Sequence, residues 1–178
     1  SVQDQVTLAE TIGVTRTHPE YYTLELGNHV LSGAFYASRL YRDLREKGGL
    51  VYTVASGVEA RKNRSLFRVS YGCDPPKVAR ARAMVEENLR EMQSAPVSPD
   101  ELRRAQILLL REIPLAEAST HGIAMSLLFR SLQGLPLDEP RRAARHYRRT
   151  TAAEVREAFR KWIRPAGFVQ VTVGPNPE

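Results

Sequence analysis

The sequence contains 178 residues, of which 42% are apolar and 26% are charged, a composition typical of globular domains. A chain of this length buries about 70% of its unfolded surface on folding and therefore needs no stabilising cross-link. The single cysteine, Cys73, excludes an internal disulfide and a cysteine-rich zinc site. No segment approaches the roughly 20 apolar residues of a transmembrane helix, so the composition excludes a membrane-spanning helix, a disordered chain and a disulfide scaffold.

The charge is unevenly distributed. The net charge is +6, and the 26 basic residues comprise 22 arginines and 4 lysines. The excess is concentrated between Arg141 and Arg149, where one tyrosine interrupts the run, a pattern that can bind phosphate groups. The run follows Asp138-Glu139-Pro140, however, and this favours a short helix whose charged face meets water. Nucleic-acid binding is therefore the less favoured interpretation.

The N-terminal part predicts one strand and two helices. Residues Val6 to Val14 alternate between apolar and polar, as in a half-buried strand. Pro19-Glu20 opens a predicted helix over Tyr21 to Leu31. A second helix is expected from about Ser38 to Lys47. It ends at Gly48-Gly49, a pair suited to a left-handed C-cap.

The middle of the chain predicts a hairpin and a helix. Leu50–Val58 and Ser65–Gly72 are rich in β-branched and aromatic residues, and their short polar linker predicts antiparallel pairing. The next segment has an apolar stripe at helical spacing. Its members are Val78, Ala81, Val85, Leu89 and Met92.

The C-terminal part predicts several helices and a closing strand. Ser98 and Glu101 have the spacing of a capping box, from which a long helix is expected to run to Gln133 with a bend at Pro114. Two further helices are expected, and the last segment has the pattern of a strand. These elements cover Asp138–Arg149, the stretch beginning at Thr150 or Thr151 with Val155, Phe159 and Ile163 aligned, and Gly167–Gly174.

The order of these elements predicts the fold class. Strands and helices are largely grouped and do not alternate strictly, which favours α+β over a doubly wound fold. We therefore expect an antiparallel or mixed sheet of at least four strands covered by several helices. No internal repeat or low-complexity linker interrupts the sequence, so residues 1–178 are expected to form a single domain.

The residue types that carry catalysis give little local signal. None of the four histidines has a partner at metal-binding helical spacing, so no metal site is expected. Cys73 has no signature of an activated thiol, and neither a phosphate-binding glycine loop nor a Gly-x-Ser-x-Gly turn is present. Composition and spacing alone therefore indicate an α+β domain without a recognisable active site.

One long segment is informative. Ser38-Arg39-Leu40, Leu44-Arg45-Glu46-Lys47 and Gly49-Leu50-Val51-Tyr52 follow a small-residue loop without a gap. This arrangement resembles the substrate-binding domain of M16-type zinc peptidases, the family of pitrilysin, insulysin and the mitochondrial processing peptidases. Four later segments occur in the same order as in that family. They are Ser98 to Ala105, Gly134-Leu135-Pro136-Leu137, Thr150 to Val155 and Val171 to Pro175.

The resemblance implies a division of labour. In such peptidases one domain binds zinc through His-x-x-Glu-His, and a metal-free domain like this one faces the zinc across a closed chamber. Residues 1–178 are then expected to be excised from a longer peptidase chain that carries the zinc site upstream, and the absence of an initiator methionine agrees with this. The chain alone is expected to hydrolyse nothing and to hold no cofactor, with zinc in the complete enzyme.

The resemblance also assigns site residues. An arginine and a tyrosine reach the substrate near the scissile bond in this family, and the matching positions are Arg45 and Tyr52. A guanidinium can hold peptide carbonyls, and a phenolic O–H can stabilise the developing oxyanion. Gly33 in the small-residue loop is expected to contact substrate as well. Two departures are visible, because Gly33 is the only glycine in its loop and Gly48 replaces a residue that is often basic.

The expected partners are a peptide or protein substrate, a zinc-bearing domain or subunit of the same family, and a second copy in a dimer of the full-length protein. No nucleic acid and no membrane span are expected. The alternative is an inactive M16-like assembly or peptide-holding subunit. A His-x-x-Glu-His helix upstream in the parent chain or in a partner would favour the peptidase over this alternative. A single cysteine is compatible with either the cytoplasm or the periplasm, so the compartment stays open. The substrate sequence stays open as well, because it depends on the shape of the chamber.

Overall fold

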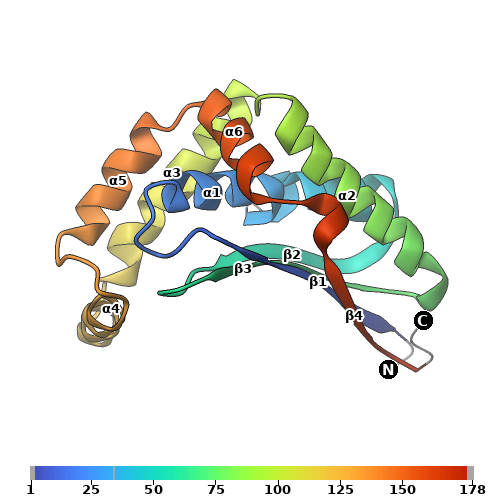
Figure 1. The fold of residues 1–178 in the computed structure, drawn as a ribbon, viewed down its shortest axis with the longest axis horizontal. Coiled ribbons are helices and arrows are strands. Elements are labelled where there is room, and N and C mark those ends of the chain that lie inside the picture. Colours follow the sequence, from blue (N-terminus) through green and yellow to red (C-terminus); the bar gives the residue numbers. More distant parts are fainter. Residues whose placement is uncertain (1–2, 34, 176–178) are drawn as a thin grey trace.

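The computed structural model describes residues 3–33 and 35–175 (Figure 1). Strands and helices follow in the order β1 (Asp4–Ile12), α1 (Tyr21–Asn28), β2 (Val51–Glu59), β3 (Ser65–Cys73), α2 (Val78–Ser94), α3 (Pro99–Ala116), α4 (Thr120–Gln133), α5 (Glu139–Arg149), α6 (Ala152–Trp162) and β4 (Val169–Val173). Short π-helical turns cover His29–Gly33 and Tyr41–Lys47, and 3-10 turns cover Phe35–Ala37, Pro75–Lys77 and Pro165–Gly167.

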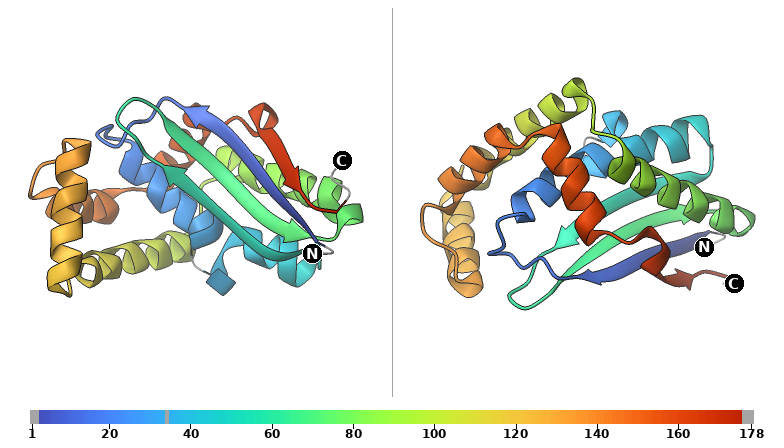
Figure 2. Two further views of the ribbon diagram at one scale, coloured as in Figure 1. Left: turned by 90° about the horizontal axis from the view of Figure 1, so that it is seen from below. Right: turned by 45° about the horizontal axis from the view of Figure 1, so that its top comes forward.

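The four strands form one antiparallel sheet in the order β2-β3-β1-β4. Helices cover one face of the sheet, and the view from below shows the other face uncovered (Figures 1 and 2). In β1 the even-numbered side chains are buried and the odd-numbered ones are more exposed, which is the predicted alternation. The expected α+β fold with an antiparallel sheet under several helices is confirmed.

The core lies between the sheet and the helical layer. The predicted stripes are buried there, because Val85 and Leu89 of α2 and Phe159 of α6 are fully inaccessible to solvent. The ring of Phe159 meets Phe67 of β3 edge to face, with centroids 6.3 Å apart. A Cβ atom on Gly27 would lie 2.3 Å from the Phe159 ring. Only glycine therefore allows α1 to cross α6 so closely.

The predicted capping box at Ser98 is present, and the structure adds a second one at the start of α6. Ser98 accepts the Glu101 N–H, and the Glu101 carboxylate accepts the Ser98 N–H at 2.8 Å. Thr151 and Glu154 make the same reciprocal pair at the start of α6. These helix starts could be predicted because both partners lie within one turn of the chain.

The single bent helix expected to run to Gln133 is wrong. Helix α3 ends at Ala116, and α4 begins at Thr120 behind a new cap in which Ser119 accepts the Gly122 N–H at 3.0 Å. Pro114 lies in the last turn of α3, where its missing N–H removes a helical hydrogen bond. The chain therefore breaks after this proline and restarts as a separate helix.

Helix α4 presents its polar side to the body of the protein. Arg130 is buried and donates to Glu117 at 2.8 Å, and Ser126 contacts the same carboxylate. The large side chains on the other sides of the helix are at least 40% exposed, namely Ile123, Met125, Leu127, Leu128, Phe129 and Leu132. The ion pair between Arg130 and Glu117 therefore connects α4 to the end of α3, and α4 projects from the helical layer in Figure 1.

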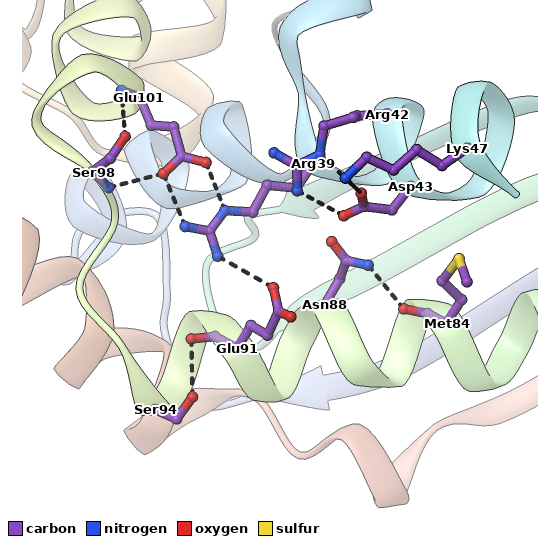
Figure 3. A network of polar contacts seen from close by, with 10 residues as sticks. All are labelled: Arg39, Arg42, Asp43, Lys47, Met84, Asn88, Glu91, Ser94, Ser98 and Glu101. Carbon is purple, nitrogen blue, oxygen red and sulfur yellow. Dashed lines mark hydrogen bonds and ion pairs between the residues drawn. The ribbon is translucent and has the colours of Figure 1, made fainter.

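The segment that precedes β2 is fixed to α3 through Arg39 (Figure 3). The Arg39 guanidinium donates to both oxygens of Glu101, at 2.8 and 2.9 Å, and lies 3.9 Å from Glu91 of α2. Leu40 and Leu44 on the same segment are fully buried. Arg39 thus ties the turn Tyr41–Lys47 to the cap of α3, which gives this arginine a structural role.

This contact predicts a loss of stability in acid. Arg39 and the Ser98 N–H lower the pKa of Glu101 to about 2, against an ordinary value of 4.5, although partial burial opposes the shift. The carboxylate therefore contributes its full stabilisation above about pH 4.5 and loses it as the pH falls towards 2. We expect the loss to be about 1–2 kcal/mol once solvent screening is included.

Urea unfolding at a series of pH values measures this contribution. The control is Glu101→Gln, which cannot ionise and should show a correspondingly flatter dependence between about pH 5 and pH 2. Equal acid sensitivity of the variant and the natural sequence would contradict the assignment to Glu101.

Candidate functional site

The candidate site is built on the turn that joins the π-helical segment Tyr41–Lys47 to β2. Gly49 has a φ of +56°, and the Leu50 N–H donates to the Leu44 carbonyl at 2.8 Å. The left-handed C-cap predicted at the glycine pair is therefore present at Gly49. It reverses the chain at the end of the helical segment and leads directly into the edge strand β2.

Arg45 and Tyr52 come together across this turn. Both side chains are exposed, with 44% of Tyr52 accessible, and the Arg45 guanidinium donates through Nη1 to the backbone carbonyl of Tyr52. Arg45 also lies over the ring of Tyr41, with its Cζ 5.5 Å from the ring centroid. Tyr41 in turn meets Tyr36 edge to face at 5.0 Å. Two further tyrosines, Tyr36 and Tyr41, therefore lie next to the predicted pair. Sequence reasoning missed both of them.

A β-bulge at Tyr52 interrupts the regular pairing of β2 with β3. Val51 pairs with Cys73, but Thr53 pairs with the adjacent residue Gly72, so Tyr52 is the extra residue of a β-bulge. Bulges turn a side chain away from the regular alternation of a strand. Here the bulge lies on an edge strand, and it leaves the Tyr52 carbonyl available to Arg45 on the unpaired side.

Two charged residues complete the site. The Tyr52 hydroxyl donates to Asp74 Oδ1 at 2.7 Å, and Lys77 Nζ lies 3.0 Å from Asp74 Oδ2 and 3.2 Å from the Gly49 carbonyl. The hydrogen bond to Asp74 raises the pKa of Tyr52 above its ordinary value of 10.0. The same contact, together with Lys77, lowers the pKa of Asp74.

Sequence reasoning missed Asp74 and Lys77, although one signal was available. Asp74 follows the last residue of β3, which pairs with the first residue of β2. Tyr52 follows Val51, just as Asp74 follows Cys73. Antiparallel pairing of Val51 with Cys73 therefore brings Asp74 close to Tyr52. The exact register and the bulge could not be predicted from the sequence.

Gly33 is exposed and ends the turn that follows α1. Its neighbour Ser32 makes hydrogen bonds with Ser56, including a 2.7 Å contact between the two hydroxyls. Gly33 therefore lies beside the middle of β2, whereas Arg45 and Tyr52 lie at its beginning. A Cβ atom at Gly33 would come within 2.8 Å of the His29 ring, so the glycine is explained by packing.

The described residues around His29 do not form a zinc site. His29 Nε2 lies 3.4 Å from Glu112, and Nδ1 lies 4.0 Å from Glu25, so the two carboxylates flank opposite ring nitrogens and do not converge on one point. No group of three or more histidine, cysteine, aspartate or glutamate residues within 3–33 and 35–175 is arranged to hold a metal ion.

The basic run forms helix α5. Its arginines are exposed, while Ala143 and Tyr147 are buried against the body. Arg142 pairs with Asp138 at 2.9 Å, and His146 stacks on Tyr22 with centroids 4.6 Å apart. The predicted short helix is therefore present, and its charged face is exposed.

Gly49 offers a direct test of the turn. Replacing Gly49 by alanine is expected to lower the free energy of unfolding by about 1 kcal/mol, because a side chain is strained at a φ of +56°. No atom lies within 4 Å of the added Cβ, so strain and not a clash causes the loss.

Gly57 is the matched control for this substitution. It also has open space around an added Cβ, but it lies within β2 without a positive φ. Gly57→Ala should therefore be neutral or stabilising by up to about 1 kcal/mol. Thermal and urea unfolding compare the two variants, and equal effects would show that Gly49 does not hold the turn.

Comparison with known proteins places the chain in a family. The sequence profile of the peptidase M16 inactive domain matches residues 3–109, which is more than half of the chain. The protein belongs to this family. The crystal structure of a peptidase M16 inactive domain from Pseudomonas fluorescens has a TM-score of 0.85 and 26% identity, and the alignment covers 99% of this chain and 42% of that one.

Two curated relatives carry protease names. An uncharacterized zinc protease of Streptomyces coelicolor is 31% identical over 93 residues, which are 52% of this chain and 20% of that protein. A protein of Bacillus subtilis named as a probable inactive metalloprotease is 23% identical over 122 residues, which are 68% of this chain and 28% of that protein. This M16 inactive domain therefore spans less than a third of either relative. No described helix is long and apolar enough to cross a membrane.

Proposed function

We propose that this M16 inactive domain holds a peptide substrate through Arg45 and Tyr52 and orients it towards a zinc ion bound by another domain or subunit. The observation that supports the proposal is the contact at the start of an edge strand, where the exposed Arg45 guanidinium donates to the backbone carbonyl of the exposed residue Tyr52. In this proposal hydrolysis takes place at the other unit, which carries the zinc ion.

The chemistry of the two groups suits a peptide backbone. A guanidinium presents five N–H donors in a planar fork, so Arg45 can donate to peptide carbonyls while it also contacts the Tyr52 carbonyl. The phenol of Tyr52 has one O–H, which can donate to the carbonyl oxygen where negative charge develops. The tyrosine rings beside Arg45 offer apolar area for the substrate side chains.

The remaining partners follow from the same proposal. The zinc-bearing unit is another domain of the same polypeptide or a separate subunit of the family, and the full-length protein forms a dimer. The share of the longer relatives that this chain spans supports such a division. Nucleic acid is not among the proposed partners.

A second candidate function is an inactive subunit that holds peptides or supports an assembly. The Bacillus subtilis relative is named as inactive, which favours this alternative. The two functions differ in one respect, because only the first requires a His-x-x-Glu-His helix in the parent chain or in a partner. Reading the parent polypeptide for this motif separates them.

Peptide binding by the 178-residue chain tests the proposal directly. Titration of the ¹⁵N-labelled chain with an unstructured synthetic peptide should shift the NMR signals of Arg45, Gly49 and Tyr52. The variant Arg45→Ala should weaken this binding, while Arg142→Ala on α5 should leave it unchanged. Signal changes confined to α5, or none at all, would overturn the proposal.

A further inference from the structure

The Tyr52 hydroxyl is already engaged before any substrate is present. A phenol has a single proton to donate, and in this structure it is donated to Asp74 Oδ1 at 2.7 Å. The bond to an ionised carboxylate is charge-assisted and therefore stronger than a bond to a neutral carbonyl. The same proton cannot be donated to a peptide carbonyl at the same time.

Asp74 is held in place to accept this proton. Its second oxygen, Oδ2, pairs with Lys77 Nζ at 3.0 Å, and Lys77 also donates to the Gly49 carbonyl at 3.2 Å. Pro75 follows directly and restricts the Asp74 backbone to the extended conformation that is observed, with φ −70° and ψ 144°. Both carboxylate oxygens are thus used, one by Tyr52 and one by Lys77.

We propose that Asp74 is a positioning residue that holds Tyr52 in a resting state, in which the carboxylate competes with the substrate carbonyl for the phenolic proton. The inference rests on the proposed function, because it concerns how Tyr52 becomes available to a peptide. A peptide binds by displacing the phenol from Asp74, after which Lys77 remains as the partner of the carboxylate. Asp74 therefore weakens peptide binding by the free domain.

The direction in which peptide affinity changes on removal of Asp74 distinguishes two roles for this residue, competition with the substrate and support of the Tyr52 ring. If Asp74 held the ring in the orientation that binds peptide, its removal would weaken binding. Competition predicts the opposite, and Asp74→Ala should tighten peptide binding by about 2- to 10-fold, the range that one hydrogen bond corresponds to. Asp74 is partly exposed and lies in a connection between elements, so the variant is expected to remain folded.

The test uses the 178-residue chain with ¹³Cζ-labelled tyrosine. In the natural sequence the Tyr52 signal should titrate above pH 10, because the contact with Asp74 raises the pKa of the phenol. In Asp74→Ala the titration midpoint of Tyr52 should fall towards the ordinary tyrosine pKa of 10.0. The dissociation constant of the synthetic peptide should also fall. The control is Asp138→Ala, which removes a carboxylate paired with Arg142 on α5 and should change neither quantity.

Two outcomes would overturn the inference while the proposed function stands. They are weaker peptide binding in Asp74→Ala, and normal peptide binding together with an unshifted Tyr52 midpoint. A natural chain that binds no peptide would overturn both. The variant Tyr52→Phe identifies the Tyr52 signal, and in this background Asp74→Ala should no longer tighten binding.

Discussion

Arg45→Ala and Tyr52→Phe, each introduced into the complete enzyme, are expected to lower kcat/KM by an amount corresponding to about 2–4 kcal/mol of transition-state stabilisation. This is roughly a 30- to 1,000-fold loss. In the proposed roles, Arg45→Ala removes donors for the peptide backbone, and Tyr52→Phe removes the O–H that donates to the oxyanion after its release from Asp74. Both side chains are exposed, so neither variant should change the free energy of unfolding substantially.

Steady-state peptide hydrolysis measures these losses, and thermal unfolding confirms that the variants are folded. Arg142→Ala serves as the matched control, because it removes an exposed arginine from α5 at a distance in the sequence from the site. Arg45→Lys is informative as well, since it keeps the charge but loses the planar fork. An unchanged kcat/KM in both Arg45→Ala and Tyr52→Phe would refute their proposed roles.

Glu139→Ala is expected to lower the free energy of unfolding by about 3–5 kcal/mol, the largest stability effect that we predict. Glu139 accepts from Arg16 at 2.5 Å and from the Tyr22 hydroxyl at 3.1 Å, and the Glu139 and Arg16 side chains are only 10% exposed. Removing the carboxylate leaves the guanidinium of Arg16 buried without its counter-ion. The pair joins the segment before α1 to the start of α5.

The adjacent residue provides the control for this prediction. Asp138 pairs with Arg142, but both side chains are about half exposed, so Asp138→Ala should cost no more than about 1 kcal/mol. Replacing both buried partners, as in Arg16→Met with Glu139→Leu, should recover much of the loss, since no charge is then left unpaired. Urea unfolding of the four chains measures these differences. A similar cost for Glu139→Ala and Asp138→Ala would contradict the role of burial.

Local sequence patterns predicted much of the fold. The alternation in β1, the stripe on α2 and the capping box at Ser98 depend on residues within a few positions of one another, and the structure contains each of them. The break after Pro114 was harder to predict. Whether a chain bends or restarts after a proline depends on the new cap at Ser119 and on what α4 packs against.

The close placement of Arg45 and Tyr52 also follows from the sequence, because a helix end, a left-handed glycine and an edge strand join them within a few residues. Their role in binding peptide stays a prediction. Hydrogen bonds of Ser32 place its neighbour Gly33 beside the middle of β2, and the expected contact of Gly33 with substrate also stays a prediction.

The sequence by itself therefore determined most of the elements, the capping box at Ser98 and the turn that carries the candidate site. Only the tertiary structure decided which residues surround that turn. The contact of Tyr52 with Asp74 requires the register and bulge of the β2–β3 pair, and Arg39 meets Glu101 only when α3 packs beside its segment. Such partners are distant along the chain, so their meeting depends on the folding of the whole sheet and helical layer, which local patterns do not encode.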